Sequence, residues 1–88
     1  MGWTVSFNAH AERQLRRLER AAQARIVDFL SERIEGGDDP RQAGKALRAV
    51  MSGLWRYRVG DYRIVCRLDD PAVTVMVIAV GHRREVYR

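Results

Sequence analysis

The sequence has little of what disulfide-linked, metal-dependent or membrane-spanning proteins rely on. It contains one cysteine, Cys66, so an internal disulfide is excluded and a reducing cytoplasm is the expected location. Two histidines and scattered carboxylates show no metal-ligand spacing, so we expect neither a metal nor a cofactor. The longest apolar run, Val75 to Val80, is far too short to cross a bilayer, and nothing resembles a signal peptide. We therefore expect no membrane partner.

The familiar motifs of nucleotide-binding and hydrolytic enzymes are also missing. Gly36 and Gly37 are followed by two aspartates, which a phosphate-binding loop does not tolerate. No serine or cysteine triad can be assembled, and Cys66 falls on the apolar face of a predicted strand, where a small buried hydrophobe is expected. At 88 residues the chain has room for a single domain, residues 1–88. Any chemistry must therefore come from other residue types.

What the chain does contain is positive charge. It has 16 basic residues against 11 acidic ones, and every basic residue except Lys45 is arginine. Arginine presents a planar fork that matches phosphate oxygens, and it keeps its charge when partly buried. A basic balance of this kind indicates nucleic acid or an acidic protein as the partner. A GC-rich genome would explain arginine in place of lysine, but it would not explain where the arginines lie.

The first half of the chain predicts a strand followed by two helices. Trp3 to Phe7 alternate apolar and polar residues, which is the period of a half-buried strand. Asn8 is a suitable helix N-cap, and apolar residues then recur at helical spacing as far as Ile34. Two helices packed as a hairpin, with a break near Arg20, fit this length better than one rod. The stretch from Gly36 to Pro40 ends the second helix in a loop.

The second half predicts three strands. Residues Arg41 to Met51 are ambiguous between a short helix and an extended connection. Leu54 to Val59, Tyr62 to Leu68 and Val73 to Val80 then form strands that are separated by turn residues. The order β-α-α-β-β-β predicts an α+β fold. Its sheet is expected to have four strands, mostly antiparallel, with the helical hairpin on one face.

The turn at Gly60 and Asp61 fixes the register of the first two of these strands. Glycine at the first of two turn positions suits a type II′ hairpin, in which Arg58 faces Arg63. Side chains alternate along each strand, and cross-strand partners share a face. One face then holds the apolar set Trp55, Tyr57, Val59, Tyr62, Ile64, Cys66 and Leu68. The other face, here called the arginine face, holds Arg56, Arg58, Arg63 and Arg67, with Val65 among them.

Four arginines on one sheet face do not favour folding. Like charges on opposed strands destabilise a sheet by a few tenths to about 1 kcal/mol per pair. A solvated face usually mixes both signs, yet the nearby acids lie only in the turns. The pattern is either an accidental basic bias or an anion site on rigid strands, suited to a polyphosphate ligand. A second group follows the last strand, where antiparallel pairing would bring it near Arg63; it consists of His82, Arg83, Arg84 and Tyr87.

Several strings carry a resemblance to a known family. The strings are L-W-R-Y-R-V-G-D-Y-R-I-V from Leu54 and V-I-A-V-G-H-R-R-E-V-Y-R to Arg88, preceded by R-x-L-x-x-L and G-K-A-L-R. Together, over essentially the whole chain, they resemble the RelE branch of the RelE/ParE toxin superfamily. The resemblance implies a RelE-like fold and a ribosome-dependent endoribonuclease that cleaves mRNA in the decoding site and inhibits translation. The ParE relatives share the fold but inhibit DNA gyrase without nuclease chemistry, and this alternative stays open, as does a non-toxic RNA-binding module.

The resemblance also implies residue roles and partners. The implied catalytic residues are Arg58, Arg63, Arg83 and Tyr87. Beyond these catalytic roles, we expect substrate RNA or rRNA to be bound by Lys45, Arg56, Arg67 and Arg84. The implied partners are the ribosome, mRNA and a cognate antitoxin from the adjacent gene, with DNA contacted only through that antitoxin. No metal or other cofactor is implied.

One departure from the family pattern affects the mechanism. The family has lysines where this chain has Arg56 and Arg58. Because arginine does not practically release its proton, these two side chains are expected to stabilise charge and not to act as bases. Proton transfer then falls to Tyr87, whose pKa neighbouring arginines would lower by favouring the phenolate. The alternative role of Tyr87 is to stack on a base without transferring a proton.

Overall fold

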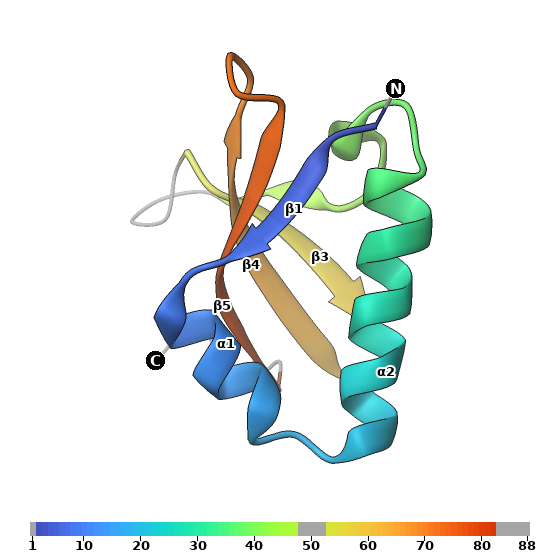
Figure 1. Cartoon of the computed structure of the whole chain (residues 1–88), viewed down its shortest axis with the longest axis vertical. Coiled ribbons are helices and arrows are strands. Elements are labelled where there is room, and N and C mark those ends of the chain that lie inside the picture. Colours follow the sequence, from blue (N-terminus) through green and yellow to red (C-terminus); the bar gives the residue numbers. More distant parts are fainter. Residues whose placement is uncertain (1, 48–52, 83–88) are drawn as a thin grey trace.

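The structure is a computed structural model that describes residues 2–47 and 53–82. The elements in chain order are β1 (Thr4–Phe7), α1 (Ala9–Arg16), α2 (Arg20–Phe29), the π-helical turn η1 (Leu30–Glu35), the 3-10 turn η2 (Pro40–Gln42), β2 (Lys45–Ala46), β3 (Trp55–Val59), β4 (Tyr62–Asp69) and β5 (Thr74–His82). The strands form one sheet in the order β1-β5-β4-β3-β2 (Figure 1). This arrangement confirms the α+β class.

Local signals in the first half of the chain place the helices. The Asn8 side-chain oxygen accepts a hydrogen bond of 2.8 Å from the Ala11 backbone N–H and so caps α1, as predicted. The two helices separate just before Arg20, and the Gln23 side-chain amide donates to the Leu18 carbonyl at 2.7 Å across this break. η1 continues α2 directly, so apolar residues up to Ile34 face the sheet.

The sheet has one strand more than the four that the sequence predicted. Within the ambiguous stretch after Arg41, the 3-10 turn η2 leads into β2, where Lys45 pairs with Arg56 and Ala46 with Trp55 in antiparallel register. A strand of two residues carries no detectable periodicity, so only the tertiary structure reveals it. At the other edge β1 pairs with β5 in parallel, which makes the sheet mixed but mostly antiparallel.

The β3–β4 hairpin has the predicted register. Val59 pairs with Tyr62 and Arg58 with Arg63. Gly60 has φ +59°, as the first central residue of a type II′ turn requires, and Asp61 is not among the residues with positive φ. The turn therefore fixes which side chains of the hairpin lie on each face of the sheet, independently of how the sheet packs.

The pairing of β4 with β5 brings the end of the last strand beside Arg63, as predicted. Arg63 pairs with Gly81, and Tyr62 with His82. A β-bulge interrupts this ladder, because Val65 pairs with Ala79 while Cys66 pairs with Val77, so Ile78 has no partner in the register. The extra residue keeps apolar side chains on the helix-facing side at both ends of β5.

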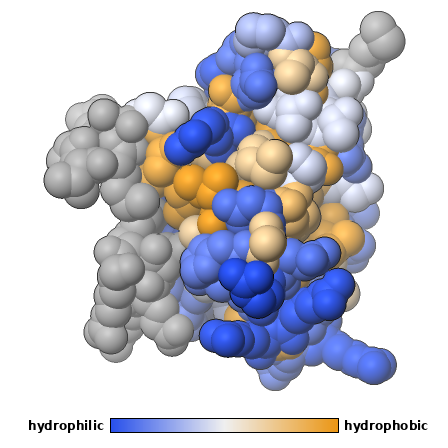
Figure 2. All heavy atoms as spheres, turned by 60° about the vertical axis from the view of Figure 1, so that its left-hand side comes forward, coloured by the Kyte–Doolittle hydropathy of each residue, from blue (hydrophilic) through white to orange (hydrophobic). Residues whose placement is uncertain are grey.

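The core lies between the helices and one face of the sheet. Its fully or almost fully buried members are Ala11, Ile26, Leu30, Ile34, Tyr57, Val59, Ile64, Cys66, Val75, Val77 and Val80. Figure 2 shows hydrophilic side chains over the end that α1 and the α1–α2 turn occupy, and apolar surface mainly in a band across the middle of that view. Among the described helices, none has the length and apolar character that crossing a membrane requires.

Candidate anion-binding site

The centre of the arginine face is the cross-strand pair Arg58 and Arg63. Arg58 is exposed, and its Nε donates to the Gly60 carbonyl at 3.3 Å. Arg63 is half-buried, and its buried Nε has no hydrogen-bond partner within the described part of the chain. An unsatisfied buried donor costs about 1–3 kcal/mol, and the cost is greater for a charged group. Stability alone therefore does not account for Arg63.

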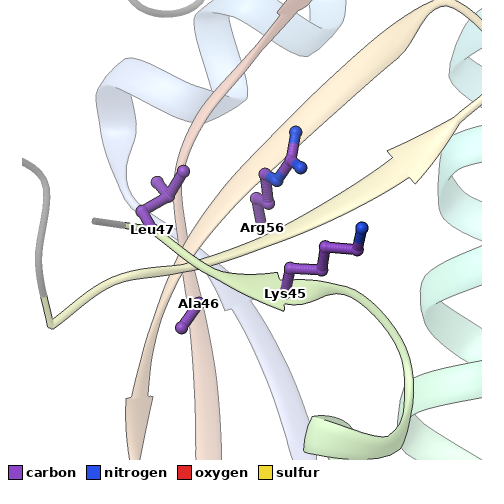
Figure 3. Close-up of a pocket in the computed structure, with 4 residues that line it drawn as sticks. All are labelled: Lys45, Ala46, Leu47 and Arg56. Carbon is purple, nitrogen blue, oxygen red and sulfur yellow. The ribbon is translucent and has the colours of Figure 1, made fainter.

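β2 adds a second cationic pair next to the first. Because Lys45 is the register partner of Arg56, both side chains leave the same face of the sheet. Figure 3 shows them on one side, together with Leu47, while Ala46 points to the opposite side. These residues line an open cavity of about 590 Å³. The predicted RNA-binding residues Lys45 and Arg56 are thus neighbours.

Three contacts fix the segment from Pro40 to Gly44 that leads into Lys45. The Trp55 indole N–H donates to the Ala43 carbonyl at 2.7 Å, and the buried Tyr57 hydroxyl donates to the Pro40 carbonyl at 2.8 Å. Burial raises the pKa of Tyr57, so its phenol stays protonated and able to donate. Arg41 holds Asp70 through two hydrogen bonds of 2.8 and 3.1 Å, and this contact lowers the pKa of the Asp70 carboxyl.

Gly44 allows β2 to approach β3 closely. Its φ is +76°, and a Cβ at this position would overlap the Arg56 carbonyl oxygen. Glycine is the residue that adopts a positive φ without steric cost. Gly44 therefore sets the position of Lys45 relative to Arg56.

The two cationic pairs meet in one open pocket of about 480 Å³. Its lining residues are Phe29, Arg33, Gln42, Ala43, Gly44, Lys45, Arg56, Arg58 and Arg63. Five of these residues are cationic and none is acidic. Like charges gathered in a concave site raise the local concentration of anions, so the pocket is suited to phosphate groups.

The predicted site residues are only partly brought together. Arg67 lies on the same face as Arg63, but four residues farther along β4, or roughly 13 Å away, and it does not line the pocket. The predicted residues Arg83, Arg84 and Tyr87 lie outside the described residues. In residues 2–47 and 53–82, no three His, Cys, Asp or Glu side chains group as metal ligands would. Cys66 is fully buried, as predicted, and burial raises its pKa to about 12.

Sequence reasoning missed the helical wall of the pocket. Arg33 from η1 lies over the ring of Phe29, with 5.7 Å between its guanidinium carbon and the ring centroid. The ring of Phe29 in turn packs against Tyr57 at a centroid distance of 5.5 Å. In the sequence, Arg33 is one of many arginines on an amphipathic helix. Only the packing of α2 against β3 and of η1 against η2 shows that it faces the same pocket as Arg58.

A family model described as the ParE toxin of type II toxin–antitoxin systems matches residues 3–87. The chain belongs to the RelE/ParE superfamily of toxins. It is 36% identical to Toxin RelG of Mycobacterium tuberculosis over 91 residues, which cover 100% of this chain and 99% of the relative. It is also 36% identical to Toxin RelE of the same organism over 84 residues, which cover 96% and 84%. The protein is therefore a type II toxin of the RelE family.

Solved structures agree with this RelE-family assignment. The toxin–antitoxin complex RelBE2 of M. tuberculosis contains a chain with a TM-score of 0.86 and 34% identity, covering 94% of this toxin and 100% of that chain. A mutant of Escherichia coli toxin RelE in the free state gives a TM-score of 0.72 at 25% identity, covering 93% and 84%. The RelE-like fold predicted from the sequence is confirmed.

Proposed function

We propose that this toxin is a metal-independent endoribonuclease that cleaves mRNA in the decoding site of the ribosome and thereby inhibits translation. The observation that carries the proposal is the pocket in which Lys45, Arg56, Arg58 and Arg63 meet without a carboxylate. A phosphodiester under attack passes through a crowded dianionic state. Preorganised positive charge stabilises such a state and is usually the largest single catalytic contribution.

The chemistry is transfer of the phosphate to the neighbouring ribose hydroxyl. The 2′ oxygen loses its proton and bonds to phosphorus, the bond from phosphorus to the 5′ oxygen breaks, and the 5′ oxygen takes up a proton. The products are a 2′,3′-cyclic phosphate and a 5′ hydroxyl. Arg58 and Arg63 stabilise the phosphate charge, because arginine does not release its proton. Arg83 adds charge and Tyr87 transfers a proton, as the family resemblance implies.

The lining of the pocket supports the proposed dependence on the ribosome. Neither a histidine nor a carboxylate is among its lining residues, so its described part offers no efficient acid–base pair. An enzyme of this kind gains most from a partner that orients the 2′ hydroxyl for attack. Arg67 and Arg84 are proposed to contact rRNA or mRNA.

The test compares naked mRNA with the same mRNA on ribosomes whose decoding site is open. We expect efficient cleavage on ribosomes and very little cleavage of the naked RNA. Robust cleavage of free oligonucleotides would contradict the ribosome dependence. The absence of cleavage under both conditions would contradict the nuclease assignment.

We also propose a cognate antitoxin, encoded by the adjacent gene, as the protein partner. The M. tuberculosis chain with a TM-score of 0.86 comes from the toxin–antitoxin complex RelBE2. A net charge of +5 and a cationic pocket suit an acidic protein segment that competes with RNA. DNA would be contacted only through the antitoxin. Co-expression with the adjacent gene product should suppress mRNA cleavage, and the two chains should copurify.

A ParE-like inhibitor of DNA gyrase is the second candidate, because the matching family model describes a ParE toxin. The RelE and RelG relatives and the carboxylate-free cationic pocket favour the nuclease. Primer extension on mRNA from cells that express the toxin separates the two. Cuts inside codons would support the nuclease, whereas DNA damage with intact mRNA would support gyrase inhibition.

A further inference from the structure

Arg33 is the cation of the pocket that neither the sequence pattern nor the family resemblance assigns to it. It comes from η1, whereas the other four cations come from β2, β3 and β4. Its side chain is exposed and makes no ion pair within the described part of the chain. It is nevertheless positioned, because its guanidinium lies over the ring of Phe29, which is itself packed against Tyr57. A guanidinium held in this way loses less side-chain entropy when it binds a ligand.

The charge in the pocket exceeds what one phosphate needs. A phosphodiester carries a single negative charge, and even the dianionic transition state carries only two. Five cations line the pocket. Their mutual repulsion is relieved most when more than one phosphate is bound, as in a stretch of RNA backbone.

Acidic residues beside Arg33 limit where a phosphate bound to it can lie. A neighbouring pocket of about 270 Å³ is lined by Glu32, Asp38 and Asp39 as well as Arg33. These carboxylates repel phosphate groups. Arg33 therefore forms the boundary between an anion-repelling surface and the cationic pocket, and a phosphate bound to it must lie on the side of Lys45.

We propose that Arg33 binds an RNA phosphate next to the one held by Arg58 and Arg63, so that RNA phosphates occupy the pocket from the arginine face past Lys45 to η1. Arg33 is then a positioning residue that orients the RNA and takes no part in bond making. This inference rests on the proposed RNA-cleaving function. The ligand is an RNA phosphodiester, which either the mRNA or the rRNA can supply.

The first test measures binding of a short oligouridylate to Arg33→Gln and to a matched control. The control is Arg20→Gln, an exposed arginine on the same helical segment, 13 residues away or roughly 20 Å along its axis. Each phosphate contact contributes about 0.7 to the slope of log affinity against log salt concentration for single strands. Arg33→Gln should lower the slope by about this amount and Arg20→Gln should not. Arg33→Lys should restore the slope, because it restores the charge.

The second test identifies the source of the phosphate. Single-turnover cleavage on programmed ribosomes should need roughly tenfold more Arg33→Gln than wild-type toxin for half-saturation, with the saturated rate nearly unchanged. A methylphosphonate, which removes the charge of one mRNA phosphate, is then placed at each position beside the cut. If the mRNA is the source, one position abolishes the difference between variant and wild type. If no position does so, the rRNA is the source.

These outcomes separate this inference from the proposed function. One outcome is a wild-type toxin that fails to cleave on ribosomes while the salt slope of its RNA binding still falls by about 0.7 in Arg33→Gln. That result would contradict the nuclease and support the phosphate contact. A toxin that cleaves normally, while Arg33→Gln matches Arg20→Gln in slope and in half-saturation, would overturn the role of Arg33. A lowered saturated rate at unchanged half-saturation would also overturn it, because a positioning contact acts on binding.

Discussion

Arg58 on β3 and Arg63 on β4 are direct cross-strand partners, so two guanidinium side chains leave one sheet face from Cα atoms roughly 4.5–5.5 Å apart. Such a pair weakens the hairpin by a few tenths to about 1 kcal/mol. It lies in a pocket with three further cations and no acid. The fold therefore retains a repulsive pair of charges at a place where a bound anion would relieve the repulsion.

Arg63→Ala should abolish growth inhibition without unfolding the toxin. The substitution removes charge from the pocket together with a buried Nε that has no partner among the described residues. Thermal unfolding followed by circular dichroism should show unchanged or slightly raised stability, while expression in cells should no longer arrest growth. Wild-type toxicity in a folded Arg63→Ala protein would remove this residue from the site.

The neighbouring substitution Ile64→Ala is the matched control. Ile64 is fully buried on the helix-facing side of the same strand. Its truncation should lower the free energy of unfolding by about 2–5 kcal/mol, measured by denaturant titration. If both variants lost stability equally, the division of β4 into a charge face and a packing face would be wrong.

Gly44→Ala should impair the toxin through the backbone. An alanine would hold an unfavourable positive φ, and its Cβ would overlap the Arg56 carbonyl oxygen. Strain of this kind costs about 1–3 kcal/mol, or β2 separates from β3 to relieve it. We expect a lower unfolding midpoint and weaker RNA binding. Gly53→Ala shares the positive φ, but its Cβ would meet no atom of the described residues within 4 Å, so it should be strained without weakening RNA binding.

Tyr87→Phe should separate proton transfer from stacking. If Tyr87 is a general acid or base, loss of the hydroxyl should lower single-turnover cleavage on the ribosome by at least about a hundredfold, with ribosome affinity nearly unchanged. Tyr87→Ala would remove the ring as well and should also weaken binding by about 1–3 kcal/mol if the ring stacks on a base. Cleavage at the wild-type rate by Tyr87→Phe would exclude the hydroxyl from the chemistry.

Cys66 should be unreactive in the folded toxin. Burial raises its pKa to about 12, whereas the pKa of an unfolded cysteine is about 8.5. Between these values the unfolded chain binds fewer protons than the folded one, so stability falls as the pH rises through this window. Alkylation at pH 8 should therefore be slow in buffer and fast in guanidinium chloride. Rapid alkylation of the native protein would show that the core around Cys66 opens readily.

Much of the second half of the fold could be predicted from the sequence, because short-range rules govern it. A glycine at the first turn position and the alternation of side chains along strands set the β3–β4 register and hence the two faces. The Asn8 cap and the break before Arg20 were likewise predicted from local chemistry. The position of the end of β5 beside Tyr62 and Arg63 followed from antiparallel geometry, whereas its exact register did not.

The sequence by itself therefore determined which residues form the arginine face. The tertiary structure decided which other residues lie beside that face. β2 was not foreseen, because two residues carry no period and their pairing depends on Gly44 meeting a carbonyl twelve residues later. The bulge at Ile78 and the position of Arg33 depend on how strands and helices pack. Contacts between distant segments form only when burial of the core brings them together, so no local pattern in the sequence records them.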